Sequence, residues 1–167
     1  MLHDEIYESL LPVKVVNTHE HLFDEKTRLE MNVDWSRIFF HYGSAPLVQA
    51  GMTWDEYVKF FTYETPHDEK WQIFSKYYPI CKNVSCIKAA VISIEKVYGV
   101  DRVDSDAMQE VNRRIGEASK PGMHRRVLRD IANIDYCMIN AIDTEFEEKI
   151  PARLWGDRKS TRLNSSH

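Results

Sequence analysis

The run VKVVNTHEHLF, residues 13–23, restricts the fold more than any other stretch of this chain. Residues two apart share one face of a β-strand but point about 200° apart on a helix, so His19 and His21 can meet only on an extended backbone. Pro12 precedes three valines, which favour strands. The run therefore predicts a strand over residues 13–18 that ends in two neighbouring imidazoles.

The same run predicts where that strand lies. It is too short for a helix and does not alternate strictly, which is typical of a strand covered on both faces in a parallel α/β sheet or barrel. In barrels the carboxyl ends of the strands carry the chemistry. Neutral imidazoles are good zinc ligands, so His19 and His21 predict a site for a divalent metal, with zinc as the first candidate. The alternative is an incidental pair, because the chain has seven histidines and short motifs arise by chance.

The segment VVNTHEHL resembles the first-strand signature of the amidohydrolase superfamily, specifically its amidohydrolase-related (type 2) families. The resemblance implies a metal-dependent (β/α)8 TIM barrel in which His19 and His21 bind the catalytic divalent metal, usually zinc. The residue before Thr18 is more often Asp in these signatures and is Asn17 here. That departure affects the support of the strand more than the metal ligands.

A second resemblance is to uronate isomerases, a branch of the same superfamily. The segments HYGSAPLVQAGM (41–52), AAVISIEKVYGVD (89–101) and DAMQEVNRRI (106–115) resemble the helical insertion after their first strand. The resemblance implies that His41 and Tyr42 contact substrate and assist proton transfer. The isomerase pattern continues with Lys-Trp-Arg where this chain has Gly-Ser-Ala, so the likeness is one of layout more than of chemistry. The alternative for His41 and Tyr42 is core or lid packing beside Phe39 and Phe40.

The remaining patterns predict a long helical region and a second strand. We expect a short amphipathic helix over 2–10 and short helices over 34–42 and 45–50. A capping box at Thr53 and Glu56 begins a helix to about residue 61, and Pro66 opens another that Pro79 ends. Further helices are expected over about 84–98, before Gly99, over about 104–118 with Asp104 as the cap, and after Pro121 to residue 131. The second strand is expected over 135–142.

A plain crossover between parallel strands needs a dozen or so residues, whereas here roughly 115 separate the two strands. In a barrel enzyme, an insertion after the first strand lies over the mouth of the barrel. We therefore expect the helical insertion, about 24–132, to act as a lid over the metal, with a helical dimerisation arm as the alternative. The basic strip HRRVLRD (124–130) is expected to be a solvated helix face rather than an anion site.

The last eleven residues, DRKSTRLNSSH (157–167), can be encoded without mismatch by a common sequencing-library adapter read in frame. We expect this tail to be artefactual and exclude it from fold reasoning. Residues 1–156 are then the N-terminal portion of an amidohydrolase-related domain, because a (β/α)8 barrel needs about 250 residues.

Charge and composition exclude several classes of function. The net charge is −4, and it becomes −6 without the tail, which disfavours binding to nucleic acid or to a membrane surface. No apolar run reaches the roughly 20 residues of a membrane helix, and no signal peptide is recognisable. Three cysteines without a metal-binding or redox spacing predict buried thiols and a cytoplasmic protein.

Three functions remain at this point. The first is a metal-dependent hydrolase in which a metal-activated water attacks a small-molecule substrate, as the resemblance implies. The second is a uronate-isomerase-like aldose-ketose isomerase, and the third is a non-catalytic helical interaction domain with incidental histidines. A homo-oligomer is compatible with all three. Two histidines are half of a tetrahedral zinc site, so we expect the 167-residue chain alone to be inactive.

Overall fold

A computed structural model describes residues 2–139 and 161–162 of the chain. The protein is mixed α/β and mostly helical. Two parallel strands flank a long helical region in the sequence, one before it and one after it. The chain divides into two compact units, residues 1–31 with 120–167 and residues 32–119. No barrel is seen in the described part of the chain.

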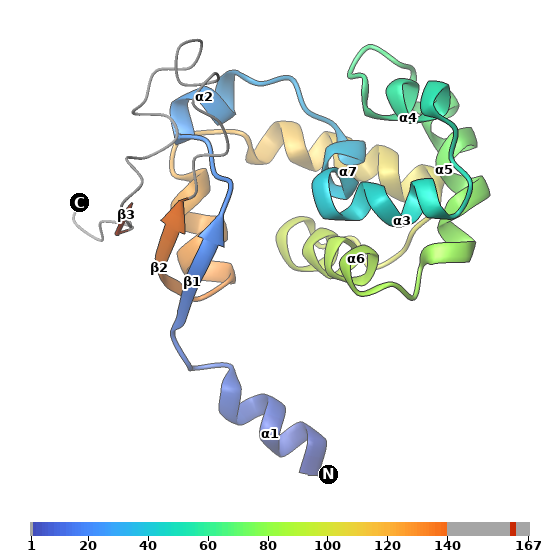
Figure 1. The fold of residues 1–167 in the computed structure, drawn as a ribbon. Helices are drawn as coiled ribbons and strands as arrows, with labels where there is room; N and C mark the ends of the chain where they lie inside the picture. The colour runs from blue at the N-terminus through green and yellow to red at the C-terminus, as the bar shows by residue number, and fades with distance from the viewer. Residues whose placement is uncertain (1, 140–160, 163–167) are drawn as a thin grey trace. The chain divides into compact units, whose positions relative to one another are not determined.

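The first unit contains the strands (Figure 1). Its elements are α1 (Leu2–Leu10), β1 (Val15–Glu20), α2 (Glu25–Glu30), the π-helix η3 (Arg125–Ile131), β2 (Ile134–Ile139) and the two-residue β3 (Thr161–Arg162). Strands β1 and β2 are parallel, with Val16 opposite Tyr136 and Asn17 opposite Cys137. The sheet order is β1-β2-β3, and β3 lies within the segment expected to be adapter-derived.

Asn133 joins the beginnings of the two parallel strands. Its side-chain amide donates hydrogen bonds to the carbonyl groups of Leu11 and Val13, and its own carbonyl accepts from the backbone N–H of Val15. Asn133 has φ 53°, and asparagine is one of the few residues that adopt this left-handed conformation readily. One residue therefore sets where β1 and β2 start relative to each other.

The first strand is confirmed as extended, but two details of its prediction are wrong. It covers Val15–Glu20 rather than 13–18, so His19 lies inside it. It is also not buried, since Val16 is 61% exposed and Val15 is exposed as well. The physical reason is that β1 pairs only with β2 among the described residues, which leaves its other edge uncovered there.

The second unit is a helical domain with its own core. Its elements are η1 (Trp35–Phe39), η2 (His41–Gly43), α3 (Ser44–Gln49), α4 (Trp54–Phe61), α5 (His67–Cys81), α6 (Ser85–Tyr98) and α7 (Ser105–Ala118). Trp35 lies at the centre, with edge-to-face contacts to the rings of Phe60 and Phe74 at centroid distances of 5.3 and 5.2 Å. Phe60 and Phe74 stack on each other at 5.5 Å. These aromatic contacts join η1, α4 and α5 into one unit.

Most predicted helices are confirmed, and the exceptions have local causes. The helix expected over 34–42 is two 3-10 segments, because Phe40 is extended and His41 takes φ 60° between them. Pro79 does not end α5, which continues to Cys81: within the last turn, proline removes only one hydrogen bond. The short α2 was not predicted, although its cap, Asp24, accepts a hydrogen bond from the backbone of Thr27 as helix-capping residues do.

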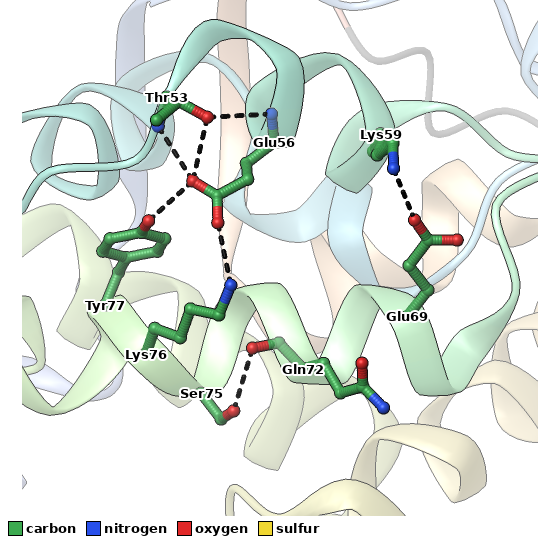
Figure 2. Close-up of polar contacts among 8 residues, drawn as sticks. All are labelled: Thr53, Glu56, Lys59, Glu69, Gln72, Ser75, Lys76 and Tyr77. Atoms are coloured by element: carbon green, nitrogen blue, oxygen red, sulfur yellow. Dashed lines mark hydrogen bonds and ion pairs between the residues drawn. The ribbon is translucent and has the colours of Figure 1, made fainter.

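The predicted capping box is confirmed, and its glutamate also contacts side chains of α5 (Figure 2). The Glu56 carboxylate accepts hydrogen bonds from Thr53 on its own helix and from Tyr77 on α5, where the Tyr77 hydroxyl is 2.6 Å away. The Lys76 ammonium group lies 2.9 Å from the same carboxylate. The hydrogen bonds from Tyr77, Lys76 and Thr53 lower the pKa of Glu56 to about 2. One carboxylate thus caps α4 and attaches it to α5.

This pKa predicts an acid-dependent loss of stability. Because the pKa of Glu56 is about 2 in the folded state and about 4.5 when unfolded, its contribution is complete above about pH 5 and falls as the pH approaches 2. Since the group is partly exposed, we expect Glu56→Gln to cost about 1–2 kcal/mol at pH 7 and little near pH 2. Urea unfolding between pH 2 and 7 measures this, with exposed Glu64→Gln as the control. Parallel pH profiles for wild type and Glu56→Gln would contradict the assignment.

Candidate metal centre

The two predicted metal ligands lie at the carboxyl end of β1. His19 is the fifth residue of the strand and His21 follows its last residue. Their Nε2 atoms are 3.0 Å apart, and the rings meet edge to face with centroids 4.8 Å apart. Two nitrogens bound to one tetrahedral zinc ion at 2.0–2.1 Å are about 3.3 Å apart. The rings therefore converge on one point as the spacing predicts, at a separation close to that of a shared metal.

The local backbone explains this convergence. The backbone N–H of His19 donates to the side-chain oxygen of Asn17 at 3.1 Å, and the amide of Asn17 hydrogen-bonds Glu20. The register against β2 shifts between Asn17 and Glu20, so the strand is irregular where the histidines begin. Such irregularities re-aim side chains near functional sites. Asn17 thus supports the strand end, which is the role expected for this position.

The hydrogen bond between the imidazoles also shows that metal binding would displace a proton from one of the two Nε2 atoms. Two neutral imidazoles that face each other through Nε2 need one of these atoms to donate and the other to accept. A metal ligand must offer a lone pair instead, so both Nε2 atoms would have to be without a proton. The donor set fits zinc in kind. Among the described residues, however, no third His, Cys, Asp or Glu completes a cluster that could hold a metal ion.

The neighbouring thiol is not poised to act as a ligand or nucleophile. Cys137 lies on β2 opposite Asn17 and is almost completely buried. Burial raises the pKa of this thiol, and the charge of Glu20 raises it further. Because the thiolate is the form that binds metals, Cys137 remains a neutral core side chain at neutral pH, as expected for the cysteines of this chain. Cys81 is likewise buried, whereas Cys86 is only partly buried.

A carboxylate anchors the segment that follows the strand. Glu25, at the start of α2, accepts hydrogen bonds from the backbone N–H groups of Gly122, at 3.1 Å, and His124, at 2.7 Å. Burial alone would raise the pKa of Glu25, but these two hydrogen bonds hold it below the usual value. Burial lowers the pKa of His124, against the opposing charge of Glu25. This anchor was not recognisable from the sequence, because Glu25 is nearly a hundred residues away from both of its partners in the sequence.

His41 and Tyr42 belong to the helical unit. Both are exposed, Tyr42 by 66%, and their rings meet edge to face at 4.4 Å. Packing inside the core is therefore excluded for these two side chains, while their neighbour Phe39 is fully buried. The substrate role of His41 and Tyr42 stays a prediction.

A histidine–serine pair in the helical unit resembles a catalytic pair but cannot act as one. The Nε2 atom of His67 lies 3.2 Å from the hydroxyl of Ser105, and its Nδ1 atom lies 3.2 Å from the indole nitrogen of Trp35. An indole N–H can only donate, so Nδ1 is the acceptor and the proton is on Nε2. His67 therefore donates to Ser105 and cannot take its proton. The sequence had not indicated this network.

Comparison with known proteins adds no family to these observations, since no family model, no curated protein and no solved structure matches the chain. None of the helices in the described ranges has the length and apolarity needed to cross a bilayer. The geometry of the histidine pair and the resemblance of its sequence are therefore the features that indicate a function.

Proposed function

We propose that this chain carries part of the metal site of a cytoplasmic, metal-dependent hydrolase of the amidohydrolase-related type. The observation that carries the proposal is the 3.0 Å separation of the His19 and His21 Nε2 atoms at the carboxyl end of a parallel strand. That strand end is where barrel enzymes hold their reacting groups. The exposed valine side chains Val15 and Val16 of β1 also support it, since the helices and inner side chains of a barrel cover both faces of its strands.

In this proposal His19 and His21 hold a divalent metal, for which zinc is the best candidate. Bound there, the metal supplies Lewis acidity that activates water or polarises a carbonyl group of a small-molecule substrate. The remaining ligands and the group that moves protons would come from later strands. Asn17 and the pairing with β2 keep the two imidazoles on a rigid backbone, which limits the freedom lost when they bind.

Zinc titration of the chain tests the site directly. We expect weak binding, because two imidazoles are half of a tetrahedral set, with both Nε2 resonances shifting together in ¹⁵N spectra of the histidine rings. His19→Ala or His21→Ala should weaken binding at least about tenfold, since a lone imidazole remains. His3→Ala removes an exposed histidine elsewhere and should leave the affinity unchanged. If zinc shifted the resonances of other residues but not those of His19 and His21, the proposal would lose its basis.

The isomerase alternative remains second because it needs His41 and Tyr42 as well as the metal pair. A longer reading frame would distinguish the hydrolase from the isomerase. A later strand-end histidine and a last-strand aspartate would support either enzyme, and arginines suited to a sugar acid would favour the isomerase. A complete reading frame with neither ligand would favour the helical interaction domain.

A further inference from the structure

Arg28 carries a guanidinium group that is partly withdrawn from water and has no counter-ion among the described residues. It lies in the last turn of α2, and the residue as a whole is partly buried. Its Nη1 atom is buried and makes no hydrogen bond. Because buried charges and buried donors in proteins are normally paired, an arginine in this state indicates a place for an anion that the described residues do not supply.

The two carboxylates nearest to Arg28 in the sequence are occupied elsewhere. Asp24 and Glu25 precede it by four and three residues, which is the spacing at which ion pairs form on a helix. The Asp24 carboxylate instead accepts hydrogen bonds from the backbone N–H and the hydroxyl of Thr27, both at 3.0 Å. The Glu25 carboxylate accepts from two backbone N–H groups of the segment before η3. Both acids therefore serve the backbone, and neither forms an ion pair with Arg28.

The imidazole of His124 belongs to the same cluster. Burial lowers the pKa of His124, the charge of Arg28 lowers it further, and the charges of Glu25 and Asp24 oppose the shift. These charges act on the ring because the three side chains lie close to it. At neutral pH the imidazole is thus uncharged, and it keeps one N–H that can donate a hydrogen bond. Arg28 and His124 together offer a cation and a neutral donor.

The cluster lies in the unit that contains the histidine pair. Helix α2 begins four residues after His21, and Figure 1 shows it beyond the arrowhead of β1, at the end of the strand that carries His19 and His21. Three extended steps and four helical rises separate the Cα atoms of His21 and Arg28, so these atoms are at most about 17 Å apart. Two long side chains and a small molecule between them can span such a distance.

The charges around Arg28 restrict the class of anion. A guanidinium group offers parallel N–H donors, which match the two oxygens of a carboxylate. A phosphate group carries nearly two negative charges, so Asp24 and Glu25 would repel it more strongly than they repel a carboxylate. We infer that Arg28, assisted by His124, binds a carboxylate group of the substrate whose reacting bond lies at the histidine pair. The carboxylate site stands on Arg28 itself, and its assignment to the substrate rests on the proposed function.

Titration of the metal-free chain with acetate tests the site. We expect the Nε–H resonance of Arg28 and the ring resonances of His124 to shift together and to saturate in the millimolar range. Arg28→Gln should weaken acetate binding at least tenfold, and Arg28→Lys should weaken it severalfold, because an ammonium group lacks the planar fork. Arg125→Gln removes an exposed arginine of the same unit and should leave the affinity unchanged.

Two salts complete this experiment. Sodium chloride at the same concentrations should leave Arg28 unshifted, and inorganic phosphate should bind more weakly than acetate. Shifts that do not saturate, or that Arg125→Gln reduces as much as Arg28→Gln, would overturn the site. Phosphate that binds more tightly than acetate would overturn the carboxylate assignment. Circular dichroism checks that the variants fold, and Arg28→Lys provides the comparison if Arg28→Gln does not.

Ligands that carry two groups test the connection with the histidine pair. The monohydroxamates of succinic, glutaric and adipic acid combine a carboxylate with a zinc-binding group, whereas acetohydroxamate carries only the zinc-binding group. In the zinc-loaded chain, we expect the best of the three to bind at least tenfold more tightly than acetohydroxamate, since its second contact is intramolecular. Arg28→Gln should abolish the difference. Equal affinities for all four ligands would overturn the assignment to the substrate.

The two titrations also separate this inference from the proposed function. If acetate binds at Arg28 but zinc does not bind His19 and His21, the proposed hydrolase fails and the carboxylate site stands. If zinc binds the histidines but acetate does not bind at Arg28, the inference fails and the metal site stands.

Discussion

Lys70→Met is expected to destabilise the helical unit by about 3–5 kcal/mol, because it leaves a buried charge without its partner. Lys70 is 1% exposed, and its ammonium group is bonded to the Asp34 carboxylate and lies 3.3 Å from the hydroxyl of Ser36. The other Asp34 oxygen accepts from the backbone N–H of Ser36 at 2.9 Å and caps η1. Every member of this buried group is satisfied in the structure.

A double variant separates the charge from the packing. Asp34→Asn removes the negative charge but keeps an oxygen that can accept from Ser36, so adding it to Lys70→Met should recover about 1–3 kcal/mol of the loss. Lys88→Met removes an exposed lysine from α6 and should change stability by less than about 0.5 kcal/mol. Hydrogen exchange of the amides in α5 and α7 measures the unfolding of this unit alone. A cost for Lys70→Met as small as that for Lys88→Met would disprove the buried ion pair.

Trp35→Ala should have an effect of similar size by a different mechanism. The side chain is fully buried and contacts Phe39, Phe60 and Phe74, so its removal leaves a large cavity and costs about 3–5 kcal/mol. Its indole N–H also donates to His67, which would lose its partner. Since a domain of this size is stable by only about 5–10 kcal/mol, this cost is a large fraction of the total stability of the helical unit.

The chain provides a matched control for this substitution. Trp54 is 73% exposed and contacts Tyr57 by stacking at 5.1 Å, so Trp54→Ala should cost less than about 1 kcal/mol. Trp35→Phe keeps an aromatic ring but no donor, and we expect an intermediate cost of about 1–2 kcal/mol. Guanidinium unfolding followed by near-ultraviolet circular dichroism ranks the free energies of unfolding of the three variants. Equal costs for Trp35→Ala and Trp54→Ala would contradict the placement of Trp35 at the centre of the core.

Local sequence was sufficient wherever the determining interaction lies within a few residues. The capping box at Thr53 and Glu56, the Asp104 cap and the left-handed Gly99 after α6 were all predictable, because each satisfies backbone groups of its own helix. The convergence of His19 and His21 belongs to the same class, since the alternation of a strand decides it. The length of the helical region between two parallel strands also followed from the sequence.

Interactions between distant residues had no such signal. Lys70 follows two acidic residues in the sequence and looks like part of a solvated face, yet it is buried because Asp34, 36 residues earlier, neutralises it. The anchoring of Glu25 to Gly122 and His124 spans nearly a hundred residues. Similarly, the valines of β1 predicted burial, but their exposure depends on which strands pair with β1.

The sequence by itself determined most of the helix boundaries, the extended run and the side of the strand on which two imidazoles meet, because backbone geometry and capping act over a few residues. Only the tertiary structure decided which charges are buried, which ring nitrogen of His67 carries the proton and which apolar faces stay exposed. Burial and partner choice are properties of surfaces brought together from distant parts of the chain, and no local pattern specifies them.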